Sequence, residues 1–140
     1  MPDNYDQLTN LFDTTPDAII VHDCEGAIID ANEQAVDCLR YTHEELTSLS
    51  VTDLEVALSG EELRTFWNAM EVEDRETMEG QHRRKDGSTV PVEVSIRKTE
   101  INSDELFLTL IRDISKRKQR KRKLERYQRL VENLPIGVYR

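Results

Sequence analysis

Two histidines and one threonine at predicted strand positions carry the groups with which proteins recognise small molecules. Strand alternation directs His22, His82 and Thr109 toward the same face as the apolar residues near them. Imidazole rings and a hydroxyl on an apolar wall can orient a bound ligand by hydrogen bonding. The same groups can instead be satisfied by a neighbouring side chain or a buried water. The pattern therefore predicts either a ligand site or an internally hydrogen-bonded core.

Three adjacent pairs of acids, Glu44-Glu45, Glu61-Glu62 and Glu73-Asp74, could suggest general acid–base catalysis. They fall on polar helix faces, where solvated acids are expected in a chain with a net charge of −9. The sequence also lacks a Gly-rich phosphate loop, a Gly-x-Ser-x-Gly turn and a His-Glu-x-x-His zinc helix. We therefore expect that the chain is not an enzyme.

The two cysteines, Cys24 and Cys38, do not form a Cys-x-x-Cys pair, and no histidine lies near them at metal-finger spacing. Neither a disulfide framework nor a metal site is predicted. Buried or unreactive thiols are the expectation.

The first half of the chain predicts a hairpin followed by helices. Pro16 ends a short flanking helix, and strands over residues 18–22 and 27–31 enclose the turn Asp23-Cys24-Glu25-Gly26. Asn32 is placed to cap a helix, and Thr42-x-x-Glu45 has the form of a capping box for a second, which is expected to bury Leu46 and Leu49. A longer helix follows Ser59, and one of its faces carries Leu63, Phe66, Trp67 and Met70.

The second half predicts three strands and a terminal helix. A strand over residues 77–83 leads into an Asp86-Gly87 turn, after which Val90, Val92, Val94 and Ile96 alternate toward one face. Residues 106–111 are apolar on both faces, which predicts a central strand covered by helices on one side and by a terminal helix or a partner on the other. The side chains expected to point toward the helix-covered face, and so to line a pocket, are Ile20, His22, His82, Val92, Val94, Ile96, Phe107, Thr109 and Ile111. They would suit a small, planar, mostly apolar molecule with a hydrogen-bonding group, such as an indole or another aromatic or heterocyclic metabolite.

Several short motifs follow one another in order along roughly residues 8–118. They are Pro16-Asp17-Ala18-Ile19, Gly26, Asp30-Ala31-Asn32, Tyr41-Thr42-x-Glu44-Glu45-Leu46, Arg84-Lys85-Asp86-Gly87-Ser88 and Asp113-Ile114-Ser115. Together they resemble the PAS sensor domain, with one departure at Arg40, where that family usually has glycine. The resemblance implies an α+β fold, in which short helices cover one face of a five-stranded antiparallel sheet and a C-terminal linker helix follows.

This resemblance divides the chain into an N-terminal flanking helix (1–15), a PAS core (16–114) and a basic signalling or linker helix (115–134). Residues 130–140 would begin a second PAS-like repeat, because Leu130 to Val138 echo Leu11 to Ile19 at an offset of 119 positions. In the linker helix, Leu124, Tyr127, Val131 and Leu134 form a weak pairing stripe. A homodimer through the flanking helices is the expected assembly.

Neither of the cofactors best known in this family is supported by a motif. Flavin-binding members carry a reactive cysteine in the helical segment, and no cysteine lies between Thr42 and Met70. One type of haem-binding member uses a histidine on the long helix, and residues 61–70 contain none. The cofactor, if any, remains open at this point.

Charge is distributed unevenly along the chain. Residues 1–111 contain 8 Lys and Arg against 25 Asp and Glu, whereas residues 112–129 contain 10 basic residues against 2 acidic ones. The acidic, lysine-poor part is typical of a halophilic and probable archaeal source, although an acidic mesophilic surface would also explain it. The basic run 116–123 lacks interleaved aromatic residues and follows the last strand, so we expect no nucleic-acid binding.

No run of 18 apolar residues and no basic and apolar leader occur in the sequence. We expect no membrane contact by this segment and a cytoplasmic location.

The sequence thus favours a sensory module of a multidomain signal-transduction protein, such as a histidine kinase or a transducer-like protein. The module would bind a small ligand and relay its state through the C-terminal helix to adjacent PAS and output domains. A ligand-free dimerisation or spacer module is the alternative. An enclosed pocket reached by His22 or His82 would favour the sensor, and a filled interior the spacer. A DNA regulator with a basic helix is a third hypothesis, which predicts steeply salt-dependent binding.

Overall fold

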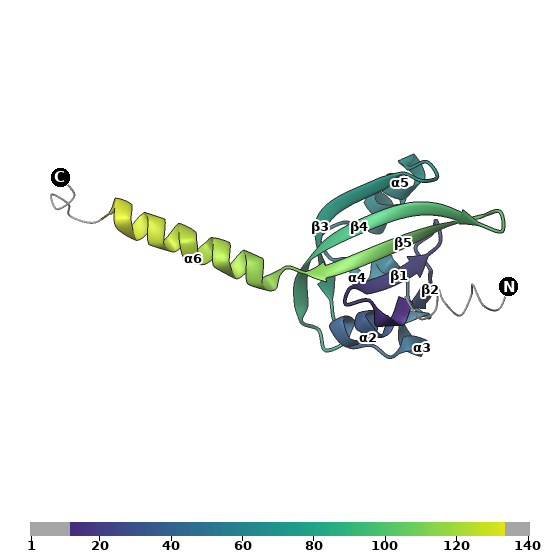
Figure 1. Cartoon of the computed structure of the whole chain (residues 1–140), viewed down its shortest axis with the longest axis horizontal. Coiled ribbons are helices and arrows are strands. Elements are labelled where there is room, and N and C mark those ends of the chain that lie inside the picture. Colours follow the sequence, from purple (N-terminus) through teal and green to yellow (C-terminus); the bar gives the residue numbers. More distant parts are fainter. Residues whose placement is uncertain (1–11, 134–140) are drawn as a thin grey trace.

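A computed structural model of the chain describes residues 12–133. Helices cover one face of an antiparallel sheet, and a long C-terminal helix projects away from it (Figure 1). The predicted α+β fold is therefore confirmed. Most of the predicted flanking helix (1–15), and most of the repeat expected over residues 130–140, lie outside the described residues.

The sheet has five strands in the order β2-β1-β5-β4-β3. Their bounds are β1 Ala18–His22, β2 Ile28–Ala31, β3 Arg75–Arg83, β4 Thr89–Ile101 and β5 Asp104–Asp113. The central strand β5 pairs with β1 on one side and with β4 on the other. Residues far apart in sequence thereby become neighbours, as in the pairs His22 with Phe107 and Ile20 with Thr109.

The helices are α2 Glu33–Leu39, α3 His43–Leu46, α4 Val51–Leu54, α5 Gly60–Ala69 and α6 Ser115–Glu132. Asn32, Thr42 and Ser59 cap α2, α3 and α5 as predicted, since each side chain accepts a hydrogen bond from a backbone N–H of the first turn. Helix α4, where Ser50 and Asp53 form a capping box, was not predicted. Leu46 is buried as expected, but Leu49 is only half-buried.

Arg40 occupies the position where the family pattern has glycine. Its φ of 67° puts the C-cap of α2 in the left-handed region, which explains why glycine suits this position. Its backbone N–H donates to the carbonyl oxygen of Val36, and its guanidinium pairs with Asp86 in the β3–β4 turn. Arg40 therefore adopts the left-handed backbone conformation at this C-cap, and its side chain links α2 to the sheet.

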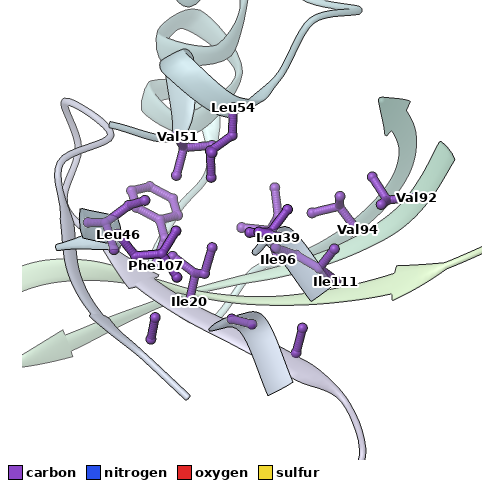
Figure 2. Packing of buried hydrophobic residues seen from close by; sticks show 14 of the residues in the cluster. Ile20, Leu39, Leu46, Val51, Leu54, Val92, Val94, Ile96, Phe107 and Ile111 are labelled. Carbon is purple, nitrogen blue, oxygen red and sulfur yellow. The ribbon is translucent and has the colours of Figure 1, made fainter. Parts of the chain in front are cut away.

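The core lies between the sheet and helices α2 to α5. Val90, Val92, Val94 and Ile96 are all buried on one face of β4, as the alternation predicts. Figure 2 shows Val51 and Leu54 on the helical side of this core, opposite residues of the sheet.

The other face of β5 is less covered than the helical face within this chain. Leu106, Leu108 and Leu110 are half-buried, whereas Phe107, Thr109 and Ile111 on the helical face are buried. Helix α6 does not supply the expected second cover, because it projects away from the sheet (Figure 1) and none of its residues is buried.

Helix α6 is held to the domain by its first turn. Buried Ile114 donates its backbone N–H to the carbonyl oxygen of Pro91. Lys118 Nζ lies 2.6 Å from Glu79 Oε1, and Arg117 lies 3.3 Å from Glu93 Oε2. The start of the basic run is thus paired with acids of β3 and β4, and the rest of the helix is exposed.

Candidate ligand-binding site

A small cavity of about 20 Å³ lies between the sheet and helices α4 and α5. Its walls come from every strand except β2, from α4 and α5, and from Glu55, which follows α4. The lining residues are Ile20, His22, Val51, Leu54, Glu55, Leu63, Trp67, Met78, His82, Val94, Ile96, Thr109 and Ile111. Of these, only Met78 is not buried, and its side chain is half-buried.

Seven of the nine residues expected from the sequence line this cavity, including both histidines and Thr109. The other two, Val92 and Phe107, are buried but lie outside the lining. Phe107 stacks against His22, with the two ring centroids 5.1 Å apart. It therefore supports a lining residue and does not itself face the cavity.

The other six lining residues were not predicted as site residues from the sequence. Leu63 and Trp67 lie on the predicted apolar face of α5, and Met78 alternates with His82 along β3, so both signals were present. Val51, Leu54 and Glu55 belong to the unpredicted α4 and to the residue that follows it. Only the Ser50-x-x-Asp53 capping pattern could have located them.

The hydrogen bonds of His22 fix its tautomer. His22 Nδ1 lies 3.0 Å from the carbonyl oxygen of Asp23, which can only accept, so Nδ1 donates. Burial lowers the pKa of His22 to about 4, so the ring is neutral near pH 7 and Nε2 is an acceptor. Thr109 Oγ1, 3.1 Å away, must therefore donate to Nε2. The hydroxyl oxygen of Thr109 keeps a free lone pair.

His82 faces the carboxylate of Glu55, and both side chains are buried. His82 Nε2 lies 3.6 Å from Glu55 Oε1. Burial lowers the pKa of His82 to about 4, so this ring too is neutral near pH 7. A carboxylate opposite Nε2 favours the tautomer with the proton on Nε2, which leaves Nδ1 as an acceptor. That Nδ1 is buried and has no hydrogen-bond partner among the described residues.

Trp67, another lining residue, also carries an unpaired polar atom. Its ring stacks at an angle on His22, with centroids 4.7 Å apart, and is almost completely buried. Its Nε1, which can only donate, has no partner in the part of the chain that the structure describes. Buried polar atoms are nearly always hydrogen-bonded, so these two nitrogens and Arg97 Nε are exceptions among the described residues.

Glu55 is held in place by backbone groups of two different segments. Its Oε2 accepts from the N–H of Ala57 at 2.8 Å and from the N–H of Gln81 at 3.0 Å. The backbone N–H of Val56 donates to the carbonyl oxygen of Gln81. These bonds connect the α4–α5 loop to β3 and fix the Glu55 carboxylate at the edge of the cavity.

Replacing Gly80 by alanine is expected to lower the free energy of unfolding by about 1–3 kcal/mol, the usual cost of overpacking. A Cβ at Gly80 would lie 2.1 Å from Glu55 Oε1, so the bonds that hold Glu55 would have to shift. Urea denaturation measures the change. The control is the same substitution in a Glu55→Ala background, where the clash is absent. An equal cost of Gly80→Ala in both backgrounds would show that the contact does not matter.

The remaining chemistry of the described residues is limited. They contain no cluster of three or more His, Cys, Asp or Glu that could hold a metal ion. Among them, no helix is long and apolar enough to cross a membrane. Cys24 and Cys38 are free thiols of intermediate burial.

Comparison with known proteins agrees with this architecture. The family model described as PAS domain matches residues 16–116. The crystal structure of the PAS domain of an HTR-like protein from Haloarcula marismortui is 30% identical, with a TM-score of 0.76 over 81% of this chain and 93% of that chain. A PAS domain from Colwellia psychrerythraea is 27% identical, with a TM-score of 0.68 over 81% of this chain and 99% of that chain.

A PAS domain from a two-component sensor histidine kinase shares the fold at 17% identity, with a TM-score of 0.68 over 80% of this chain and 97% of that chain. No curated protein matches the sequence. The family model covers most of the chain, and the solved PAS domains share its sheet and helices. This chain therefore belongs to the PAS domain family, whose members are sensory modules and not catalysts.

Proposed function

We propose that this PAS domain binds a small, planar, mostly apolar ligand in the cavity and relays the bound state through α6. The observation that supports this most is a cavity between the sheet and α4 and α5 with an almost wholly buried lining, two residues of which, Trp67 and His82, carry buried nitrogens without a partner among the described residues. A ligand with hydrogen-bonding groups would satisfy these atoms, while Ile20, Val94 and Ile96 would pack against its apolar part.

The ligand would bind a more open state of the domain. A cavity of about 20 Å³ holds roughly one water, and a bicyclic ring needs several times that volume. Met78 is the half-buried lining residue, and its flexible side chain can turn outward at low cost. Further room would come from movement of α4 and α5. Because the ligand would bind only the open state, it would shift the population toward that state.

Helix α6 is placed to respond to such a shift. It follows β5 directly, and its first turn contacts β3 through Glu79 and β4 through Glu93. Met78 and His82 of β3 line the cavity on either side of Glu79 in sequence. A displacement of β3 around a ligand would therefore move one of the two acids that anchor α6.

The partners would be a second copy of the chain and the domains that follow it. Leu124, Tyr127, Leu130 and Val131 of α6 are large apolar residues that are more than half exposed, which suits pairing of two such helices. The output would come from a histidine kinase or a transducer-like protein in the cytoplasm. The acidic composition and the similarity to the Haloarcula marismortui domain support a haloarchaeal source.

The direct test is native mass spectrometry of the purified protein in volatile salt, followed by denaturing extraction and identification of any released compound. We expect a stoichiometric small molecule, or saturable binding of an added aromatic metabolite with an increase in Tm. The control is a Trp67→Phe, His82→Gln double variant, which is expected to lose the bound mass. An empty protein that also shows no thermal shift with flavin, haem or small aromatic metabolites would contradict ligand binding.

A ligand-free dimerisation or spacer module is the second candidate, and the small volume of the cavity favours it. In that case the cavity would hold at most about one buried water. The module would then act only by holding neighbouring domains in register through α6. An empty protein that remains dimeric would support this function.

A further inference from the structure

The apolar side of α6 that is proposed to pair two copies continues toward the domain as a cationic side. Counting back from Val131 in steps of four and three residues leads to Tyr127, Leu124, Arg120 and Arg117. Residues at this spacing lie along one side of a helix, and we call these residues the extended stripe. Its C-terminal part is apolar and exposed, whereas its N-terminal part consists of the two arginines.

The two arginines of the extended stripe differ in their surroundings. Arg117 lies 3.3 Å from Glu93 Oε2 and 3.8 Å from Glu79 Oε2, so acids of its own sheet compensate its charge. The hydrogen bond from Lys118 lowers the pKa of Glu79, which keeps that carboxylate charged near pH 7. Beyond its first turn α6 projects away from the sheet (Figure 1), and within the described residues only Arg117 and Lys118 of this helix form ion pairs. Arg120 therefore carries an uncompensated charge on the extended stripe.

Pairing of two copies would bring these charges together. The proposed relay needs parallel helices, because the domains that follow lie beyond the C-terminal end of both. In a parallel pair each residue of the extended stripe faces the same residue of the other copy, with the helix axes about 8–10 Å apart. The two copies of Arg120 would then face each other, and Lys116, Lys121 and Lys123 beside the stripe would add to the repulsion. Apolar attraction and charge repulsion thus act on the same helix pair in opposite directions.

Salt decides which of these two effects is larger. The screening length is about 10 Å at 0.1 M salt and about 3 Å at 1 M. The first length spans the distance between the helix axes and the second does not, whereas the burial of apolar surface is not electrostatic and is not screened. We infer that ionic strength controls the pairing of α6, so that two copies stay apart in dilute salt and pair in molar salt. This inference rests on the proposed function, because it names what regulates the proposed helix pair.

The experiment is sedimentation equilibrium of the full chain at KCl concentrations from about 0.1 M to about 2 M. We expect the dissociation constant of the dimer to fall at least tenfold between the lowest concentration and about 1 M. A dissociation constant that stays constant or rises with salt would overturn the inference and leave the proposed pairing standing. A chain that is monomeric throughout would overturn both the inference and the proposed homodimer, while native mass spectrometry decides ligand binding separately.

Two variants with the same change of charge test the role of Arg120. Arg120→Gln removes the uncompensated charge from the extended stripe, and is expected to dimerise at least threefold more tightly than the parent in dilute KCl and to depend less on salt. Arg122→Gln removes a charge on the opposite side of the helix, and is expected to dimerise no more tightly than the parent. Repulsion between the acidic domains predicts weaker pairing for both variants, because each makes the net charge of −9 more negative. Equal dissociation constants of the two variants would overturn the role of Arg120.

Leu124→Gln tests whether the contact runs through α6. Leu124 is 66% exposed, so its replacement is expected to leave the fold and the far-UV circular dichroism of the domain unchanged. The variant keeps the charge of the parent but removes an apolar residue from the extended stripe. We expect it to dimerise at least tenfold more weakly than the parent at about 1 M KCl. Dimerisation equal to that of the parent would place the contact elsewhere on the domain and overturn the inference.

Discussion

Acidification from pH 6.5 is expected to lower the free energy of unfolding, and His22 and His82 are each expected to contribute about 3 kcal/mol to this loss. The loss reaches its full size only below pH 4. Burial lowers the pKa of both rings from 6.5 to about 4 in the folded protein. In this range the unfolded chain binds protons that the folded protein does not. The stabilisation is therefore complete above pH 6.5 and is lost as the pH falls toward 4.

The measurement is chemical denaturation at pH 7.5, 6.5, 5.5 and 5.0 at constant salt. Between pH 6 and 5 each buried histidine is expected to contribute a slope of somewhat under 1.4 kcal/mol per pH unit. In this pH range the carboxylates whose pKa is lowered do not contribute to the slope, since the ordinary pKa values of Glu45, Glu79 and Asp86 are 4.5 or below. Their contributions are lost only at lower pH.

His82→Gln serves as the control for this prediction, because it removes one of the two titrating rings. The variant is expected to show about half of the slope of the parent between pH 6 and 5. A parent whose stability is constant from pH 7.5 to 5.0 would show that the two histidines are not buried in neutral form.

The same burial limits what the sequence alone could predict. His22, His82 and Thr109 could be assigned to the inner face because strand alternation is a local property. The neutral state of the rings, however, comes from their burial in the folded protein. The orientation of the His22 ring depends on its bonds to Asp23 and Thr109. Thr109 is 87 positions from His22 in sequence, so no local pattern reveals this contact.

The fold was more predictable than the site for a related reason. Caps such as Asn32 and Ser59, and the alternation from Val90 to Ile96, act over a few residues and are visible in any single sequence. The cavity volume instead results from how α4 and α5 pack on the sheet. Glu55 became recognisable as a site residue only when β3 and the α4–α5 loop were brought together.

Asn32 illustrates how a locally visible motif can also carry long-range contacts that the sequence does not show. The capping bond to the N–H of Ala35 was expected, at 3.0 Å. The same side-chain oxygen also accepts from the N–H of Ile19 at 2.8 Å, and the amide nitrogen donates to the carbonyl oxygens of Phe12 and Asp17. One buried amide thus joins the N-terminal segment, β1 and α2.

Replacing Asn32 by alanine is therefore expected to lower the free energy of unfolding by about 3–5 kcal/mol. The side chain is completely buried, and its removal leaves backbone donors and acceptors without partners, at a cost of about 1–3 kcal/mol for each group that water cannot reach. Chemical denaturation at pH 7.5 measures the change. The matched control is Ser59→Ala, which removes an N-cap at the exposed start of α5 and is expected to cost about 1 kcal/mol.

The difference between the stability losses of Asn32→Ala and Ser59→Ala measures what the contacts of Asn32 other than its capping bond contribute. An Asn32→Asp variant divides them further, since a carboxylate keeps the two bonds to Ile19 and Ala35 but repels the carbonyl oxygens of Phe12 and Asp17. We expect Asn32→Asp to be much less stable than the parent at pH 7.5, although its cap is intact. If both Asn32 variants cost no more than Ser59→Ala, the amide would act as a simple cap, and the junction between the N-terminal segment and the sheet would depend on other contacts.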